Sequence, residues 1–434
     1  MRIKLYAAVA ALALVPAFTY AQDVHKLISQ TDVERIIKTL SADDMQGRAT
    51  FSPGIDKAAT FIEGEFKKAG IKPLTGNGTF RQAFTKTRFS TTNIKVSLDG
   101  AVLPADQVSV SAGTAFNWKS DADVQVVNVS ADKKLMTEYR TIMRSGKKTL
   151  AIIDPSFADM FKRIKERNNS GIIADKASTA PAIVFVLGTT TPKAFDISAE
   201  VKEEKLPLFN VAGMIPGKSK PNEYVVFSGH YDHLGFIKPV EGDSIANGAD
   251  DDASGTTAVI SLAKYYKKLN NNERTLIFVA FTAEEIGGYG SQYFSKQLNA
   301  DQVVAMFNIE MIGKDSKFGP KTAFITGFER SDFGTILQKN LEGTEFKFHP
   351  DPYPQQQLFY RSDNATLAAL GVPAHSISTD QIDTDKLYHS VNDEFESLDV
   401  NNIIATIRAI ALSSRTIVSG KDTPSRVAKL EGRQ

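Results

Sequence analysis

Two stretches decide the fold: residues 224–232 read YVVFSGHYD, and residues 276–285 read LIFVAFTAEE. In each, a short apolar run typical of a buried β-strand gives way to polar groups. The first run is followed by His230 and the second by Glu284 and Glu285. Because open α/β sheets bind ligands at the carboxyl ends of their strands, both stretches predict side chains at one functional edge.

The same alternation continues outward through the C-terminal half of the chain. Further apolar runs lie at 303–309 and 322–325, and helical patterns lie at 254–269 and 401–418. Strands that alternate with helices favour an α/β fold. We therefore expect a three-layer αβα sandwich around a central mixed, mostly parallel sheet, beginning near residue 206.

The N-terminal part is expected to complete this domain over residues 22–92. A helix is predicted at 31–41, with Thr31 and Glu34 as a capping box, and a second helix at about 55–69. The central part of the chain differs from both.

Residues 93–205 contain short β-rich runs separated by polar, lysine-rich segments, and a hairpin turn is predicted at Asp99-Gly100. No group of residues in this stretch has catalytic spacing. We interpret 93–205 as a smaller, β-rich inserted lobe that divides the catalytic domain into 22–92 and 206–434.

The first 21 residues resemble a signal peptide. Arg2 and Lys4 precede the apolar run Leu5–Phe18, which at ~14 residues is too short to span a bilayer with ease. A buried N-terminal helix is the alternative. The chain has no cysteine, which excludes a lipid-anchored lipoprotein, a disulfide scaffold and a thiolate zinc site. We expect export to a bacterial periplasm or exterior, with no membrane span after cleavage.

The charge balance excludes one class of partner. The chain has 51 basic and 50 acidic residues, and removal of residues 1–21 takes away only two basic ones. A near-neutral surface gives no support for nucleic-acid binding. The length of 434 residues exceeds one ordinary core and favours two lobes, but it does not predict an oligomeric state.

Several polar groups have the chemistry of a two-metal hydrolase. Glu310 ends the run 303–309, and Asp251 precedes the helix that starts at Ser254-Gly255. A carboxylate at a helix N-terminus is kept ionised and oriented, as a ligand that bridges two metals requires. Imidazole and carboxylate are the usual zinc donors when no thiolate is available, and His230 and His389 supply the imidazoles.

Two metals ~3.5–4 Å apart can polarise a carbonyl and generate a hydroxide near neutral pH. Of the adjacent Glu284 and Glu285, one would coordinate and the other would transfer the proton. Each motif alone has an ordinary explanation, such as a solvated helix face for the glutamate pair or a surface loop for His389. His233 is interpreted as a structural or substrate-pocket residue and His375 as a buried, hydrogen-bonded one.

The quoted motifs resemble those of the zinc exopeptidases that include bacterial leucyl aminopeptidases, vacuolar-type aminopeptidases and glutamate carboxypeptidase. Four segments carry the resemblance at the site: His230–Asp232, Asn247–Gly255, Phe281–Gly287 and Tyr388–Asp393. Two more lie outside it: Ser41–Arg48 is similar to the N-terminal cap, and Gly371–Pro373 to a late motif. The resemblance covers roughly 25–90 and 206–418, and 93–205 occupies the place of a protease-associated insert.

The resemblance implies roles for individual residues. One zinc ion would be held by His230, Asp251 and Glu310, and a second by Asp251, Glu285 and His389. Glu284 would be the general base, Asp232 would orient His230, and Tyr388 would stabilise the oxyanion. Co²⁺ or Mn²⁺ could replace Zn²⁺. One residue departs from the pattern, because many members have Asp where this chain has Glu310.

The expected function is that of an aminopeptidase that removes N-terminal residues from peptides. Carboxypeptidase or dipeptidase activity of the same family remains an alternative, because the residues alone do not distinguish them. A glutaminyl-cyclase-type acyltransferase would use a single zinc, and a binding protein on this scaffold would lack the ligands. We expect residues 234–246 and 351–363 to line the entrance to the site.

Overall fold

The computed structural model describes residues 24–76, 78–120 and 123–430 of the 434-residue chain. The chain forms two compact units. The large unit contains the described residues up to Ala83 and those from Leu208 onward, and the small unit is Phe84–Pro207. The expected signal peptide, residues 1–21, lies outside the described residues.

A mixed sheet forms the middle layer of the large unit, with the strand order β17-β16-β18-β15-β11-β14-β10. Its central strand β11 (Lys220–His230) is parallel to both β14 (Arg274–Phe281) and β15 (Val303–Ile309). The carboxyl ends of these three neighbours therefore lie at the same edge of the sheet.

The outer strands make the sheet mixed. Strand β18 (Ala374–Ser378) is parallel to β15, whereas β10 (Phe195–Ile215) is antiparallel to β14. Strand β16 (Thr322–Ile325) is antiparallel to β18 and parallel to β17 (Lys347–Pro350), and the short β1 (Lys72–Pro73) pairs with β10. The expectation of a mixed, mostly parallel sheet is confirmed.

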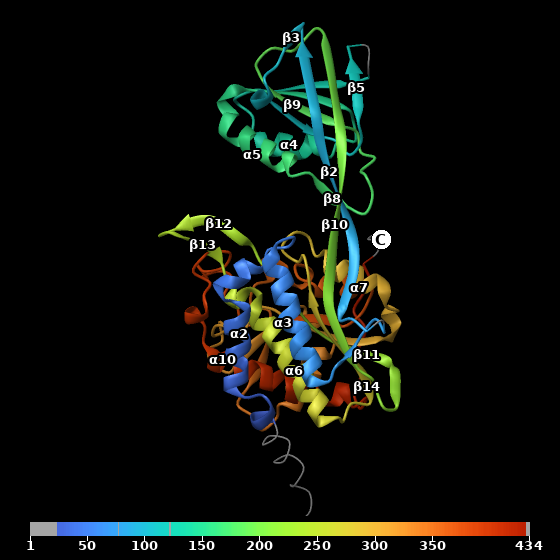
Figure 1. Ribbon diagram of the computed structural model, residues 1–434, viewed down its shortest axis with the longest axis vertical. Coiled ribbons are helices and arrows are strands. Elements are labelled where there is room, and N and C mark those ends of the chain that lie inside the picture. The colour runs from blue at the N-terminus through green and yellow to red at the C-terminus, as the bar shows by residue number, and fades with distance from the viewer. Residues whose placement is uncertain (1–23, 77, 121–122, 431–434) are drawn as a thin grey trace, which may run out of the picture. The chain divides into compact units, whose positions relative to one another are not determined.

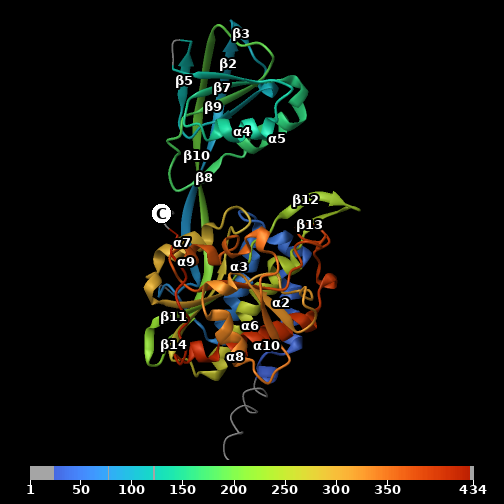
Figure 2. The same cartoon turned by 180° about the vertical axis from the view of Figure 1, so that it is seen from behind.

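Helices cover both faces of this sheet. Successive residues of a strand point to opposite faces, so each face can bury its own set of apolar side chains. On β11, Phe227 belongs to one buried apolar cluster and Val226 to another. The first face carries α2 (Gln30–Leu40), α3 (Pro53–Ala69), α6 (Gly255–Leu269), α8 (Phe333–Asn340), α10 (Val400–Ser413) and α11 (Arg415–Val418). Helices α2, α3, α6 and α10 lie together in Figure 1. The second face carries α7 (Tyr289–Gln297) and α9 (Asn364–Ala369), which are also labelled in Figure 2. The three-layer αβα arrangement is confirmed.

The two N-terminal helices lie close to their predicted positions. Helix α3 ends before Gly70, whose φ of 73° is in the left-handed region that glycine adopts easily. Helix α2 begins one residue before the prediction, because Ser29 caps it: the Ser29 hydroxyl accepts a hydrogen bond from the backbone N–H of Asp32 at 3.3 Å. The prediction of Thr31 as the capping residue was wrong.

The small unit contains a four-stranded sheet with the order β4-β9-β7-β6. Its elements are β4 (Val108–Ser111), β6 (Gln125–Val129), α4 (Leu135–Met143), β7 (Thr149–Ile153), α5 (Ala158–Asn169) and β9 (Ile183–Leu187). The predicted turn at Asp99-Gly100 is confirmed, since it joins β2 (Arg81–Leu98) to β3 (Ala101–Val102). Two further short strands are β5 (Phe116–Lys119) and β8 (Ile172–Ala174). In its described part, the small unit holds no group of potential metal ligands.

Candidate metal centre

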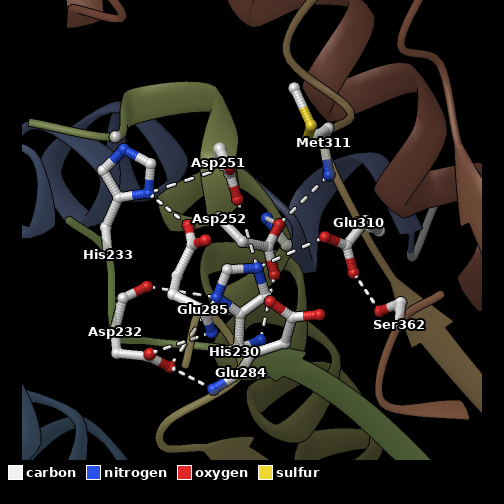
Figure 3. Close-up of polar contacts among 12 residues, drawn as sticks. His230, Asp232, His233, Asp251, Asp252, Glu284, Glu285, Glu310, Met311 and Ser362 are labelled. Atoms are coloured by element: carbon white, nitrogen blue, oxygen red, sulfur yellow. Dashed lines mark hydrogen bonds and ion pairs between the residues drawn. The ribbon is translucent and has the colours of Figure 1, made fainter. Parts of the chain in front are cut away.

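The strand ends of the large unit bring the expected side chains together. Strand β11 ends at His230, β14 ends just before the segment Thr282–Glu285, and β15 ends just before Glu310. Asp251 comes from the segment that leads into α6. Figure 3 shows that these side chains converge from separate elements on one place.

Three donor atoms meet in the first cluster. The Nε2 atom of His230 lies 3.1 Å from Oδ1 of Asp251 and 3.2 Å from Oε1 of Glu310. His230 and Asp251 are buried, and Glu310 is partly exposed. The structure therefore brings together the first ligand set that the resemblance implied.

The second cluster shares Asp251 through its other carboxylate oxygen. The Nε2 atom of His389 lies 3.3 Å from Oδ2 of Asp251 and 3.1 Å from Oε2 of Glu285. The His389 side chain is 35% exposed, so solvent reaches this side of the centre. One carboxylate thus gives an oxygen to each cluster, which is the arrangement of a bridging ligand.

The spacing of the donors fits a divalent metal. Zinc binds nitrogen and oxygen ligands at about 2.0–2.2 Å, so two ligands of a tetrahedral ion lie about 3.3–3.6 Å apart. The four distances from the two histidines are 3.1, 3.2, 3.3 and 3.1 Å, close to the lower end of that range. The residues present therefore fit the metal that the donor types suggest.

A third imidazole contacts the second cluster. The Nδ1 atom of His233 lies 2.8 Å from Oε1 of Glu285 and 3.7 Å from Oδ2 of Asp251, and its side chain is fully buried. The shorter distance is that of an N–H···O hydrogen bond. Sequence reasoning did not give His233 a place beside Glu285. Its position three residues after His230, at the same strand end, was the available signal.

His375 is the buried, hydrogen-bonded histidine that the sequence predicted. Its Nδ1–H donates to the Thr326 carbonyl at 2.8 Å, and its Nε2 accepts from the Ser331 hydroxyl at 2.8 Å. These contacts use the one donor and one acceptor of a neutral imidazole. Burial lowers the pKa of His375 to about 4, so the ring is neutral at pH 7.

Two buried aspartates that the sequence did not assign hold the main chain of the ligands. Asp252 accepts hydrogen bonds from the backbone N–H of His230 at 3.0 Å and of Met311 at 3.1 Å. Asp393 accepts one from the backbone N–H of Asp251 at 3.1 Å. Carboxylates that fix backbone groups in this way fix the side chains that the backbone carries.

Asp232 acts differently from what the resemblance implied. Its main-chain carbonyl, at 3.1 Å, accepts the hydrogen bond from Nδ1 of His230, whereas its carboxylate is 3.8 Å away. The carboxylate instead accepts hydrogen bonds from the backbone N–H groups of Glu284 at 3.1 Å and Glu285 at 3.3 Å. Asp232 therefore orients the imidazole through its backbone and the glutamate pair through its side chain.

The electrostatics of the centre favour a bound cation. Burial alone would raise the pKa of Asp251, but hydrogen bonding to His230 and the neighbouring imidazoles hold it well below its usual range. Burial lowers the pKa of His389, but hydrogen bonds to Asp251 and Glu285 outweigh this and raise it to about 10. Protons on the imidazoles thus balance the carboxylates, and a divalent ion that replaces them meets the donors it prefers.

Glu284 lies in the wall of a small, open cavity of about 90 Å³ next to these donors. Burial raises its pKa well above the usual range, and the negative charge of Glu310 adds to this effect. Tyr388 lines the same cavity and stacks on His389, with 3.8 Å between the ring centroids. The two residues expected to act on the substrate therefore face the same space.

The remaining lining is largely apolar and hydroxylic, with Met311, Phe324, Leu358 and Ile382 among the apolar residues. Of the two predicted entrance segments, 351–363 contributes Leu358, Arg361 and Ser362 to the lining. The other, 234–246, contributes none and forms the two-stranded ribbon of β12 (Gly235–Val240) and β13 (Asp243–Ala246).

The whole constellation falls inside one region of sequence similarity. Residues 210–413 match Peptidase family M28, and this range includes all five expected metal ligands. The segment is an M28 peptidase domain. A peptidase is a hydrolase that acts on peptide bonds.

Two curated relatives share part of the M28 domain. A stretch of 109 residues is 35% identical to a probable zinc metalloprotease of Pyrenophora teres f. teres (strain 0-1), and covers 25% of this chain and 22% of that protein. A stretch of 212 residues is 27% identical to leucine aminopeptidase 1 of Ajellomyces capsulatus (strain G186AR), and covers 45% of this chain and 52% of that protein. The chain thus spans about half the length of these relatives, or less.

The fold is similar to that of a solved aminopeptidase from Aneurinibacillus sp. strain AM-1. The TM-score is 0.53 at 18% identity, and the match covers 95% of this chain and 98% of that one. At this identity the similarity shows the fold of the M28 domain. Of the helices in the described ranges, none is long and apolar enough to cross a membrane.

Proposed function

We propose that this chain is a zinc-dependent aminopeptidase that removes N-terminal residues from peptides. The observation that carries the proposal is the sharing of Asp251 between two donor clusters, with Glu284 in the wall of the adjoining cavity. The names of the two curated relatives, a zinc metalloprotease and a leucine aminopeptidase, agree with it.

Five residues would hold two zinc ions. His230 and Glu310 would bind one ion, Glu285 and His389 the other, and Asp251 both. Cobalt or manganese would serve as substitutes. When bound, the two ions would polarise the scissile carbonyl group and lower the pKa of the attacking water.

The protein's own groups would move the proton. Glu284 would accept a proton from the attacking water as the new C–O bond forms, and would deliver it to the amine nitrogen as the C–N bond breaks. The hydrogen bonds from the backbone of Glu284 and Glu285 to Asp232 hold the base in place. The Tyr388 hydroxyl would donate a hydrogen bond to the carbonyl oxygen as negative charge develops there.

Substrate recognition requires a place for the free α-ammonium group. The carboxylate of Glu310 lines the cavity and supplies negative charge, and Phe324 and Leu358 supply an apolar wall for a side chain. Arg361 lines the same cavity and is the feature that favours the alternative, a carboxypeptidase or dipeptidase. A cation at this place could bind the carboxylate of a substrate.

A panel of substrates separates these activities. We expect hydrolysis of aminoacyl-nitroanilides and of peptides with free N-termini, and no hydrolysis of their N-acetylated counterparts. Peptides blocked at the C-terminus should be cleaved as well as free ones. Cleavage of N-acetylated peptides that depends on a free C-terminus would replace the aminopeptidase by the carboxypeptidase.

We also propose that residues 1–21 direct export to a bacterial periplasm or exterior, and that 93–205 is a protease-associated-like insert. The basic residues, apolar run and small residue before Gln22 support the first proposal. A mature protein that begins at Gln22 in the exported fraction, identified by mass spectrometry, is the expected result. Retention of the full chain inside the cell would contradict it.

A further inference from the structure

Arg48 is a buried arginine in the short turn η1 (Asp43–Arg48), between α2 and α3. Its side chain is completely buried, at 0% exposure. Its guanidinium donates hydrogen bonds to five main-chain carbonyl groups: Leu40 (2.7 Å), Tyr231 (2.9 Å), Asn247 (2.6 Å), Gly248 (2.8 Å) and Asp251 (3.4 Å). In the part of the chain that the structure describes, it forms no ion pair.

Burying the Arg48 cation costs free energy, so the contacts that offset this cost indicate a structural role. A buried cation is destabilising unless its donors are satisfied and opposite charge is near. Arginine has five N–H groups in a rigid planar fork, and here five carbonyl oxygens receive them. A lysine offers three donors around a single point and could not reproduce the pattern.

Four of the five carbonyl groups belong to the segments that carry the metal-ligand candidates, and the fifth, that of Leu40, ends α2. Tyr231 lies directly after His230, and Asn247 and Gly248 lie in the segment that leads to Asp251. The main chain of Arg48 adds a further contact, because its carbonyl accepts a hydrogen bond from the backbone N–H of His233 at 3.2 Å. One residue thus ties the N-terminal turn to both ligand segments.

We propose that Arg48 is a positioning residue for the metal centre. It holds the segments of His230 and Asp251 at the spacing that a metal requires, before any metal binds. It has no contact with a donor atom and acts only through the backbone. The inference rests on the part of the proposed function that assigns zinc to these clusters, and it does not depend on the substrate.

A second buried arginine provides a matched control. Arg274 is 1% exposed and donates to the carbonyl groups of Ile417 and Asp422, both at 2.7 Å, and to the Glu223 carboxylate at 2.6 Å. It belongs to the same unit, but within the described ranges its guanidinium forms no hydrogen bond to residues 230–233 or 247–255. A variant at Arg274 therefore measures the general cost of disturbing a buried arginine.

The test compares R48K with R274K in the full chain. Zinc affinity is measured by competition with a chromophoric chelator, and the visible absorption of the Co²⁺ form reports the geometry of the centre. We expect R48K to bind zinc about 10- to 100-fold more weakly, with an altered Co²⁺ spectrum. R274K should bind zinc within twofold of the wild type, although both variants melt at lower temperatures.

The outcomes distinguish this inference from the proposed function. If the wild type binds no zinc, the proposed function fails. If the wild type binds zinc and R48K matches it within twofold, or R274K is weakened equally, the role of Arg48 is refuted. Should R48K not fold, D43A replaces it, because exposed Asp43 in the same turn accepts a hydrogen bond from the Asn247 side chain at 2.8 Å. A loss of about 2- to 10-fold is expected for D43A, and no loss would refute the inference.

Discussion

Two histidines contact Glu285, and their contact distances assign them different roles. His389 lies 3.1 Å from Oε2 of Glu285 and 3.3 Å from Asp251, as two ligands of one metal would. His233 lies 2.8 Å from Oε1 of the same glutamate and 3.7 Å from Asp251. These distances are those of a hydrogen-bond donor to the Glu285 oxygen that does not face His389. We predict that His389 is the ligand and that His233 orients Glu285.

The structure gives the size of the two effects. H389A removes one of three donors from the second cluster, so zinc content should fall from two ions to one per chain. H233A removes a single hydrogen bond to a charged acceptor, worth about 1.5–3 kcal/mol. With tenfold for each 1.4 kcal/mol, the affinity of the second ion should fall about 10- to 150-fold, and excess zinc should restore it.

H233N is the variant that separates the two roles. The amide N–H of asparagine can donate to Glu285, but asparagine is a poor zinc ligand, so H233N should recover much of the affinity that H233A loses. Zinc content by elemental analysis and affinity by competition titration are the assays. H375N is the matched control, because His375 is equally buried and its ring nitrogens hydrogen-bond to Thr326 and Ser331, neither of which is a candidate metal ligand.

The opposite pattern of zinc loss would assign the ligand role to His233. If H233A lost the second ion even in excess zinc, H233N did not restore it, and H389A kept both ions, then His233 would be the ligand. In that case the group formed by His233, Asp251 and Glu285 would be the metal site, and the exposed His389 would act on the substrate.

Three further predictions follow from the same geometry. E284Q should keep its zinc content while turnover falls about 10²- to 10⁴-fold, whereas undiminished turnover would remove Glu284 as the base. Dialysis against a chelator should abolish hydrolysis and zinc, cobalt or manganese should restore it; activity that survives chelation would end the metal hypothesis. Because the pKa of His375 is about 4 when folded and 6.5 when free, the unfolded chain takes up a proton as pH falls from 6.5 to 4 and the folded chain does not. In denaturant titrations, the free energy of unfolding of the wild type should therefore fall by about 3 kcal/mol more than that of H375N between pH 6.5 and pH 4. An equal pH dependence of the two unfolding free energies would contradict this prediction.

The fold of the large unit was predictable because its signals are local. The apolar run 276–281 is a strand buried along its whole length, and the helical pattern at 254–269 became α6. The meeting of three strand ends followed from the rule that parallel strands bring their carboxyl ends to one edge, whereas the strand order and register come from the structure. The capping residue of α2 was mispredicted because Ser29 and Thr31 have the same chemistry, and only the backbone geometry distinguishes them.

The candidate ligands were also visible in the sequence, because metal chemistry restricts the residue types. The residues that hold them were not visible for a physical reason. Asp252, Asp393 and Arg48 bind main-chain N–H or carbonyl groups, which every residue offers, so no partner motif marks them. The same holds for Asp232, where the sequence identified the residue but not which of its atoms contacts His230.

The hydrogen bonds around Glu310 show how this chain can place a glutamate where the resemblance leads us to expect an aspartate. Its side chain is longer than that of the usual Asp and has one more torsion to fix, which costs conformational entropy. Hydrogen bonds hold this torsion. The Oε2 atom of Glu310 accepts them from the Ser362 hydroxyl and from the Asn308 amide at 3.4 Å, while Oε1 faces His230. Ser362 also lines the cavity, so a substitution of Ser362 would change both the support of this candidate ligand and the wall of the cavity.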